Sequence, residues 1–253
     1  MRLDKYLASR FGSRTKAARA IAEGLVVRNG KPASASDDVS ETDVVEVREK
    51  QISFVSEGGF KLYKALCEFG EKVRDAVFAD IGASTGGFTD CLLQCGAARV
   101  YAVDVGESQL AQSLQTDGRV VVRDRVNARY LKAEDFPEQL DGITADVSFI
   151  SLKLILPSVS SILDGKGRAF VLVKPQFECG AKALDKHGIV KDAREREKAV
   201  LSVCEEARRL GLYAADISIA PIKPHKNVEF VLFLTKDCTR AVPFERLQKK
   251  LSP

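Results

Sequence analysis

The sequence lacks the long apolar runs and the secretion signal that are typical of membrane and exported proteins. No apolar stretch approaches the roughly 20 residues that a membrane-spanning helix needs. The opening residues MRLDKYLASRF are charged throughout and contain no apolar core of a signal peptide. We therefore expect a cytoplasmic protein that does not associate with membranes.

Cysteine and histidine are too few, or too scattered, to predict a disulfide framework or a metal centre. The six cysteines follow no regular spacing, and the only histidines are His187 and His225. Zinc sites use four nitrogen or sulfur ligands with characteristic spacings, and the sequence contains no such set. We expect reduced cysteines and no bound metal.

The charge of the chain is uneven along its length. A chain of 253 residues, 45% hydrophobic and 29% charged, has the composition of an ordinary globular protein and is long enough for one large domain or for a domain and a small module. The net charge is only +4, but residues 1–31 hold eight basic and two acidic side chains, and residues 32–57 reverse this balance. The first segment is therefore a candidate surface for a polyanion.

Residues 1–47 have the pattern of a small module with two helices and a hairpin. Apolar residues at helical spacing predict a first helix, and a second should begin after the N-cap Ser13 and end at Gly24. Asn29-Gly30 is a strong hairpin signal, and residues 44–47 predict a further strand. The second helix is expected to bury Ala17, Ala18, Ile21 and Ala22.

This order of elements and its basic face resemble the S4 RNA-binding module, on the residues RLDKYLASRFGSRTKAARAIAEGLVVRNGKPA. The alternative is a small helical cap with a solvated charged face. We expect an S4-like domain over 1–47, a linker over 48–57 and a second domain over 58–253. The side chains expected to contact RNA are Arg2, Lys5, Arg14, Lys16, Arg19 and Arg28.

The second domain is organised around residues 77–105, VFADIGASTGGFTDCLLQCGAARVYAVDV. An apolar run, a glycine-rich turn, a helical pattern and a second apolar run ending at Asp104 predict the first unit of a nucleotide-binding α/β domain. A dinucleotide fingerprint would have glycine where Ser84 stands, which disfavours a nicotinamide-dependent dehydrogenase. No phosphate-binding G-x-x-x-x-G-K-[ST] motif occurs either.

This turn instead resembles the cofactor turn of S-adenosylmethionine-dependent methyltransferases. The resemblance implies that Asp80 and Gly82 surround the methionine part of the cofactor and that Asp104 binds its ribose. Asp124 or Asn127 would contact the adenine, although ordinary loop polarity explains these two equally well. The full set of expected cofactor residues is Asp80, Gly82, Ser84, Gly86, Gly87, Phe88, Asp104, Asp124 and Asn127.

The remaining pattern predicts an α/β fold with a seven-stranded, mostly parallel, Rossmann-like sheet. Strands are expected over 77–81, 100–103, 120–122, 142–145, 168–173, 213–219 and 228–235. Helices are expected over 58–69, 107–115, 151–163 and 192–210. In methyltransferases of this type the last strand runs antiparallel.

Charged residues stand where several of these strands meet one edge of the sheet, which is where ligands bind in open α/β sheets. Asp146 and Lys174 follow the fourth and fifth strands, and Glu229 lies at the start of the seventh. Each position alone is weak, because charged residues are common at strand ends.

Together with Lys61, these residues match the K-D-K-E tetrad of the FtsJ-like ribose 2′-O-methyltransferases. With GGFKL, DIGASTGGFTD, DVSFISL, VKPQFE and KNVEF, the whole chain resembles the hemolysin A (TlyA) family of ribosomal RNA methyltransferases. The resemblance implies formation of 2′-O-methylcytidine in ribosomal RNA. Members with a short N-terminus, as here, are associated with the 23S RNA of the large subunit. The alternatives are a non-catalytic RNA-binding or ribosome-assembly factor and a hemolysin-like protein.

The chemistry of ribose methylation fits the same residues. A ribose hydroxyl is a weak acid, so the enzyme must align it and guide its proton. We expect Lys174 to act as the base with Lys61 beside it, while Asp146 and Glu229 orient the groups. The segment after the fourth strand lacks the two prolines typical of amine N-methylation. Stacking on a base and buried packing both remain open for Phe149 and Phe177.

Overall fold

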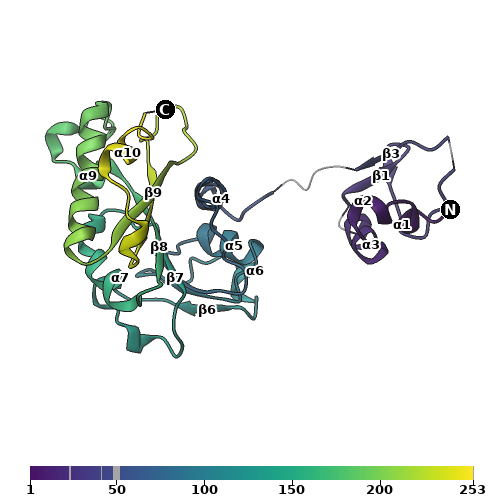
Figure 1. Cartoon of the computed structure of the whole chain (residues 1–253), viewed down its shortest axis with the longest axis horizontal. Coiled ribbons are helices and arrows are strands. Elements are labelled where there is room, and N and C mark those ends of the chain that lie inside the picture. The colour runs from purple at the N-terminus through teal and green to yellow at the C-terminus, as the bar shows by residue number, and fades with distance from the viewer. Residues whose placement is uncertain (23, 41, 48–51, 253) are drawn as a thin grey trace. The chain divides into compact units, whose positions relative to one another are not determined.

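The computed structural model describes residues 1–22, 24–40, 42–47 and 52–252, and it divides the chain into two compact units (Figure 1). The first unit is Met1–Ser53 and the second begins at Phe54. The ring of Phe54 packs against Phe60 in the first helix of the second unit, with ring centroids 5.0 Å apart. The expected linker over 48–57 lies partly outside the described residues.

The first unit combines short helices with a three-stranded antiparallel sheet in the order β2-β1-β3. The expected hairpin is confirmed: Asn29 and Gly30 both have positive φ values, +51° and +74°, as a tight two-residue turn between β1 and β2 requires. Its elements are α1 (Leu3–Tyr6), α2 (Ala8–Phe11), α3 (Arg14–Ala22), β1 (Val26–Arg28), β2 (Lys31–Pro32) and β3 (Val45–Val47).

Two details of these helices differ from the sequence prediction. The first helix is interrupted at the buried Leu7, which is the C-cap of α1 and the N-cap of α2. In α3 the buried side includes Ala20 and not Ala22, which is exposed. The helix therefore turns its 17, 20 and 21 positions toward the small core, which is a normal i, i+3, i+4 face.

The acidic residues of the first unit neutralise part of its basic surface. Asp4 is buried and accepts hydrogen bonds from the guanidinium groups of Arg2 at 3.2 Å and Arg14 at 2.9 Å. These bonds lower the pKa of Asp4 from 3.8 to about 2. Arg28 likewise forms an ion pair with Asp43 at 3.7 Å. Three of the six expected RNA contacts thus also hold the unit together.

The Asp4 cluster should make the first unit sensitive to acid. Because the pKa of Asp4 is lower in the folded protein, its stabilising contribution is present above pH 3.8 and is lost as the pH falls through about 2. We predict that Asp4→Asn reduces the protection of α3 amides from hydrogen exchange at pH 6. This difference from the parent should shrink as the pH approaches 2. A difference that does not change with pH would contradict the assignment.

The second unit is built on a seven-stranded sheet in the order β6-β5-β4-β7-β8-β10-β9. Strand β10 runs antiparallel to both of its neighbours, while β6, β5, β4, β7 and β8 pair in parallel, which confirms the predicted fold class. The strands are β4 (Val77–Ile81), β5 (Arg99–Val103), β6 (Val120–Arg123), β7 (Gly142–Ala145), β8 (Arg168–Val173), β9 (Tyr213–Ile219) and β10 (Phe230–Thr235).

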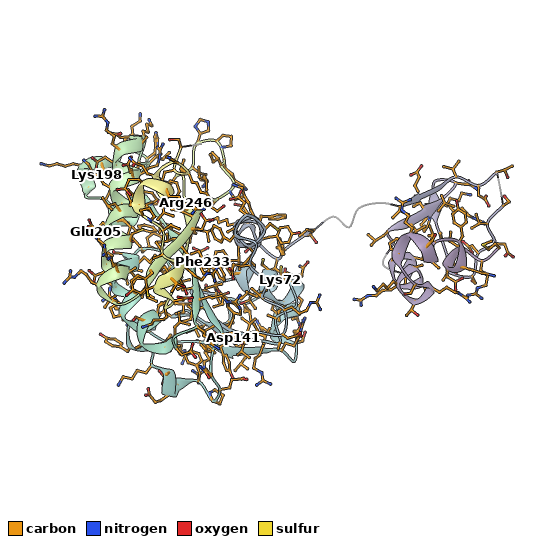
Figure 2. The ribbon with its side chains drawn as sticks, viewed as in Figure 1. Lys72, Asp141, Lys198, Glu205, Phe233 and Arg246 are labelled. Carbon is orange, nitrogen blue, oxygen red and sulfur yellow. The ribbon has the colours of Figure 1, made fainter. Side chains whose placement is uncertain are left out.

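Helices cover both faces of this sheet because its central strands are apolar on both sides. One face packs Phe78, Phe170 and Phe233 against α4 and α5, and the other packs Ile143 and Leu232 with the buried residues of α7 and α9. Phe233 is buried, whereas the charged Lys72, Lys198, Glu205 and Arg246, which Figure 2 also labels, are exposed. The longer helices are α4 (Glu57–Phe69), α5 (Gly87–Gln94), α7 (Leu156–Ile162) and α9 (Ala193–Arg209).

Several connections are shorter or more broken than the sequence suggests. The helix expected over 107–115 is reduced to one turn, and the helix expected over 151–163 begins as a 3₁₀ turn. The short helices are α6 (Gln112–Gln115), α8 (Pro175–Glu178) and α10 (Phe244–Gln248). The 3₁₀ turns are η1 (Ala128–Tyr130), η2 (Ala133–Asp135), η3 (Leu152–Leu154), η4 (Ala181–Ala183) and η5 (Cys238–Arg240). Among the described residues, no helix is both long enough and apolar enough to span a membrane.

Candidate active site

The glycine turn between β4 and α5 is held in a tight conformation that its sequence permits. Gly82 has a φ of +77°, and a Cβ atom there would lie 2.7 Å from the carbonyl oxygen of Asp146. Gly86 has a φ of +96° and is the N-cap of α5. At Gly87 a Cβ atom would lie 2.3 Å from Oγ of Ser56. The absence of side chains therefore lets the turn approach the next strand and helix α4 closely.

A small cavity of about 150 Å³ opens above this turn. The expected cofactor residues Gly82, Ser84, Gly87 and Phe88 all line it. Asp146, Ser148 and Lys174 line it as well, so the structure brings the glycine turn and half of the expected tetrad to one place.

Asp104 lies at the end of β5 and is fixed by two backbone amides. Its Oδ2 accepts a hydrogen bond from the amide of Ser84 at 2.8 Å, and its Oδ1 accepts one from the amide of Gly106 at 2.7 Å. A carboxylate oxygen has a second lone pair, so each oxygen retains the capacity to accept from a ligand hydroxyl.

Asp80 occupies a different position from the one expected of a cofactor contact. Its side chain is fully buried and accepts hydrogen bonds from the hydroxyl groups of Thr89 at 2.7 Å and Thr144 at 2.8 Å. Burial raises the pKa of Asp80 to about 6, against an ordinary value of 3.8. The carboxyl group thus supports the turn from within the sheet and does not line the small cavity.

Asp124 and Asn127 also lie apart from the small cavity. Asp124 accepts a hydrogen bond from the amide of Ser108 at 2.9 Å, and Asn127 caps η1 by accepting one from the amide of Arg129 at 3.1 Å. Both side chains line a second cavity, of about 590 Å³, beside the end of β6. Local loop bonding therefore accounts for the contacts that these two polar side chains make.

The four residues of the expected tetrad form two ion pairs at the same edge of the sheet. Nζ of Lys174 lies 2.6 Å from Oδ1 of Asp146, and Nζ of Lys61 lies 2.6 Å from Oε2 of Glu229. The register pairs Phe230, the first residue of β10, with Val173, the last residue of β8, so Glu229 immediately precedes β10 and lies beside the end of β8. Glu229 thus reaches Lys61 on α4, a pairing that strand order alone did not predict.

Two polar residues that sequence reasoning missed complete these pairs. Nζ of Lys174 donates a hydrogen bond to Oγ of Ser148 at 2.7 Å, and Nε2 of Gln176 donates one to Oε1 of Glu229 at 3.3 Å. The Lys174 side chain is only 9% exposed, which requires such partners for its charge. Both residues lie two positions beyond a tetrad member, which is the one signal by which the sequence could have indicated them.

The loop that follows Asp146 presents an exposed aromatic ring. Phe149 is 92% exposed and has a φ of +63°, a left-handed conformation that a bulky residue rarely adopts. Its ring centroid lies 5.5 Å from that of Phe177. Glu178 holds the loop by accepting hydrogen bonds from Oγ of Ser151 and the amide of Leu152, both at 2.6 Å. The predicted alternative of buried packing is therefore wrong for Phe149.

This fold and this arrangement of charged pairs beside a glycine turn define a methyltransferase of the Rossmann-like class. Residues 54–236 match the FtsJ-like methyltransferase family, and residues 1–45 match the S4 domain. The chain belongs to the FtsJ-like methyltransferases, and within them to the hemolysin A (TlyA) family.

Named relatives cover almost the whole chain. The 16S/23S rRNA (cytidine-2′-O)-methyltransferase TlyA of Mycobacterium tuberculosis is 41% identical, over 93% of this chain and 89% of its own. Hemolysin A of Brachyspira hyodysenteriae is 41% identical, over 91% of this chain and 98% of its own. A solved structure of a Streptococcus thermophilus protein described as a hemolysin is 37% identical, with a TM-score of 0.75, and covers 99% of this chain and 94% of its own.

The bonding of Asp104 yields a test of the cofactor site. An amide at this position can accept through only one oxygen and would direct an NH₂ group at one of the two backbone amides. We predict that Asp104→Asn weakens S-adenosylmethionine binding about tenfold or more in isothermal titration. Asp164→Asn is the matched control, because Asp164 accepts from the amide of Lys166 in a turn before β8, at the opposite sheet edge. Equal affinities for the two variants would contradict a cofactor role for Asp104.

Proposed function

We propose that this chain is an S-adenosylmethionine-dependent enzyme that methylates the ribose 2′-hydroxyl of cytidine in ribosomal RNA, and that its target lies in the 23S RNA of the large subunit. The proposal rests on the family of the chain and on the activity for which its M. tuberculosis relative is named. Such a substrate implies that the enzyme works in the cytoplasm.

One observation carries the proposal above all others. The Lys174–Asp146 pair and the cradle of glycine backbone share one small cavity, and the Lys61–Glu229 pair lies at the same sheet edge. A glycine cradle suits a ligand that needs close backbone approach, while partly buried lysine–carboxylate pairs suit the handling of a proton or a hydroxyl group. A purely structural role would not require both features in one place.

We infer that Gly82, Ser84, Gly87 and Asp104 would hold S-adenosylmethionine. When bound, it supplies a methyl group that is already activated on a sulfonium centre. The remaining task of the protein is to align the ribose oxygen and to receive its proton. We assign proton acceptance to the neutral amine of Lys174, which forms when the paired ammonium first releases a proton to solvent. Asp146 and Ser148 would fix the position of Nζ, and the Lys61–Glu229 pair would orient the incoming ribose.

RNA recognition is assigned to two features. The first unit supplies exposed cations such as Lys5 and Lys16, which suit contacts to phosphate groups. Near the cavity, the exposed ring of Phe149 with its neighbour Phe177 suits stacking on a base that is turned out of its helix. The loop bonds made by Glu178 support this role, because they hold the ring in solvent despite its apolar character.

The assignment of Lys174 as the base predicts a specific pattern of loss. Lys174→Ala should lower kcat for methyl transfer about 100-fold or more, while the affinities for S-adenosylmethionine and RNA stay close to those of the parent. Lys174→Arg should be almost as damaging, because arginine keeps the charge but cannot release a proton at accessible pH. Single-turnover transfer to RNA, measured with the melting temperature, gives the comparison.

Two outcomes would overturn this assignment in different ways. If the arginine variant retains most of the parent's activity, Lys174 orients the reacting groups and another group accepts the proton. If both variants are fully active, the tetrad is not the catalytic centre. A loss of activity that only follows a loss of melting temperature would mean that the Lys174–Asp146 pair is structural.

The basic face of the first unit yields a second prediction. Replacing Lys16 and Arg19 with alanine should weaken RNA binding and lower the slope of log affinity against log salt by about one for each phosphate group that the variant no longer binds. Arg14→Ala should weaken binding too, but should also destabilise the unit, because Arg14 neutralises Asp4. Lys249→Ala, an exposed lysine near the C-terminus, is the control. An unchanged salt slope would show that this face does not contact RNA.

A further inference from the structure

A large cavity lies beside the Lys61–Glu229 pair and is separate from the cavity of the glycine turn. Its volume is about 790 Å³, and it shares none of its lining residues with the smaller cavity. Lys61, Gln176 and Glu229 line the large cavity, whereas Asp146, Ser148 and Lys174 line the small one. The two ion pairs of the tetrad therefore face two different spaces at one sheet edge.

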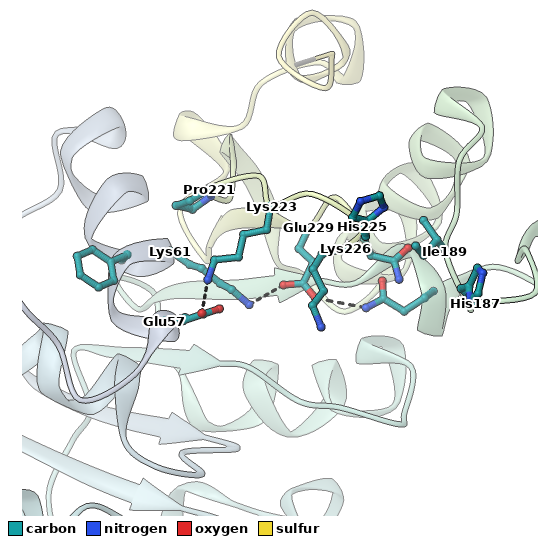
Figure 3. Close-up of a pocket in the computed structure, with 12 residues that line it drawn as sticks. Glu57, Lys61, His187, Ile189, Pro221, Lys223, His225, Lys226 and Glu229 are labelled. Carbon is teal, nitrogen blue, oxygen red and sulfur yellow. Dashed lines mark hydrogen bonds and ion pairs between the residues drawn. The ribbon is translucent and has the colours of Figure 1, made fainter.

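Basic side chains dominate the far wall of the large cavity. Lys223, His225 and Lys226 come from the loop between β9 and β10, and His187 comes from the loop after η4 (Figure 3). Lys61 reaches the cavity from α4 on the other side. The cavity thus gathers three lysines and both histidines of the chain.

The two loops form one wall because Asn227 joins them. Its Oδ1 accepts a hydrogen bond from the amide of Val190 at 2.8 Å, and its Nδ2 donates one to the carbonyl of Gly188 at 2.9 Å. These bonds hold the His187 loop against the Lys226 loop. The cationic wall is therefore a fixed feature of the fold and not a chance approach of two surface loops.

The carboxylates in the cavity are already neutralised. Glu229 pairs with Lys61, and Glu57 pairs with Lys223. The side chains of Lys223, Lys61 and Lys226 together lower the pKa of Glu57, with Lys223, which pairs with it, contributing most. Figure 3 shows Lys61 reaching Glu229 and Lys223 reaching Glu57, each joined by a dashed line. No carboxylate among the described residues forms an ion pair with Lys226.

The chemistry of the wall selects an anion that is joined to a flat or apolar group. The ammonium of Lys226 and the exposed imidazoles suit a singly charged phosphodiester, and the half-exposed ring of Phe60 on the opposite wall suits a ribose or a base. A volume of this size has room for a nucleotide unit. The Lys61–Glu229 pair would then lie between this unit and the cavity of the glycine turn.

We propose that this cavity binds the sugar–phosphate backbone of single-stranded RNA next to the nucleotide to be methylated, with Lys226 as the principal phosphate contact. The inference rests on the proposed function, because it assigns to the substrate the space that the glycine turn does not line. It adds a second RNA-binding surface, in the unit that carries the tetrad, to the S4-like unit.

The test compares three single variants of the full-length chain. Lys226→Ala should raise the KM for ribosomal RNA about tenfold and lower the salt slope of oligocytidylate binding by about one, with little change in kcat. Lys226→Arg should restore both, because a guanidinium also binds phosphate. Lys166→Ala, which removes an exposed lysine from a turn at the opposite edge of the sheet, should behave like the parent.

A chemical probe separates phosphate contact from general attraction. Oligocytidylate with neutral methylphosphonate linkages should bind the parent more weakly than the natural oligomer does. If Lys226 contacts a phosphate, the position at which neutralisation matters most for the parent should lose its effect in Lys226→Ala. Equal sensitivity of parent and variant at every linkage would overturn the proposal, as would a variant whose S-adenosylmethionine affinity falls while its RNA affinity does not.

The outcome also distinguishes this inference from the proposed function. If the parent chain transfers no methyl group to ribosomal RNA but still shows the Lys226-dependent binding of oligocytidylate, the proposed activity is wrong and RNA binding in the large cavity is supported. If the parent methylates RNA and Lys226→Ala does so with unchanged KM and salt slope, RNA binding in the large cavity is wrong and the proposed activity is supported. Melting temperatures of all variants should match the parent, since Lys226 is exposed.

Discussion

The burial of Lys174 at the end of β8 is the constraint on which the site depends. A nearly buried ammonium is costly unless it is paired and hydrogen-bonded, and here Asp146 and Ser148 from the loop after β7 meet that need. That loop must therefore lie against the end of β8, which also brings the carbonyl oxygen of Asp146 close to the glycine turn. Because β10 runs antiparallel beside β8, Glu229 arrives at the same edge and is neutralised by Lys61 from α4. One buried charge thus connects three strands, a turn and a helix.

Two cavities lie at this edge of the sheet, and each is lined by one of the two ion pairs of the tetrad. The small cavity has backbone walls and suits a ligand that approaches glycine closely, whereas the large cavity has a cationic wall and suits a polyanion. A methyl transfer between two such ligands must pass between the two spaces, where the ion pairs stand. In this view each lysine of the tetrad is neutralised by its paired carboxylate until a substrate hydroxyl enters.

The fold could be predicted from the sequence because its signals are local. Strand β4, the glycine turn and β5 follow from apolar runs and from glycines at positions of positive φ, and the hairpin of the first unit follows from Asn29-Gly30. Side-chain direction was harder to predict. Asp80 stands at a strand end, but the pleat turns it inward between two threonine hydroxyls. The partner of Glu229 depends on how α4 packs, which no periodicity encodes, and the acids that pair with Arg14 and Arg28 are set by the fold of the first unit.

The central claim is that the methyl group reaches a ribose oxygen, and the chemistry of RNA offers a direct measurement. Ribosomal RNA incubated with the full chain and S-adenosylmethionine labelled in its methyl group can be hydrolysed with alkali, which needs a free 2′-hydroxyl to cleave each linkage. The account predicts that the label is recovered in alkali-resistant dinucleotides whose 5′ member is cytidine. Label recovered in mononucleotides would mean that a base is methylated, and that result would contradict the account.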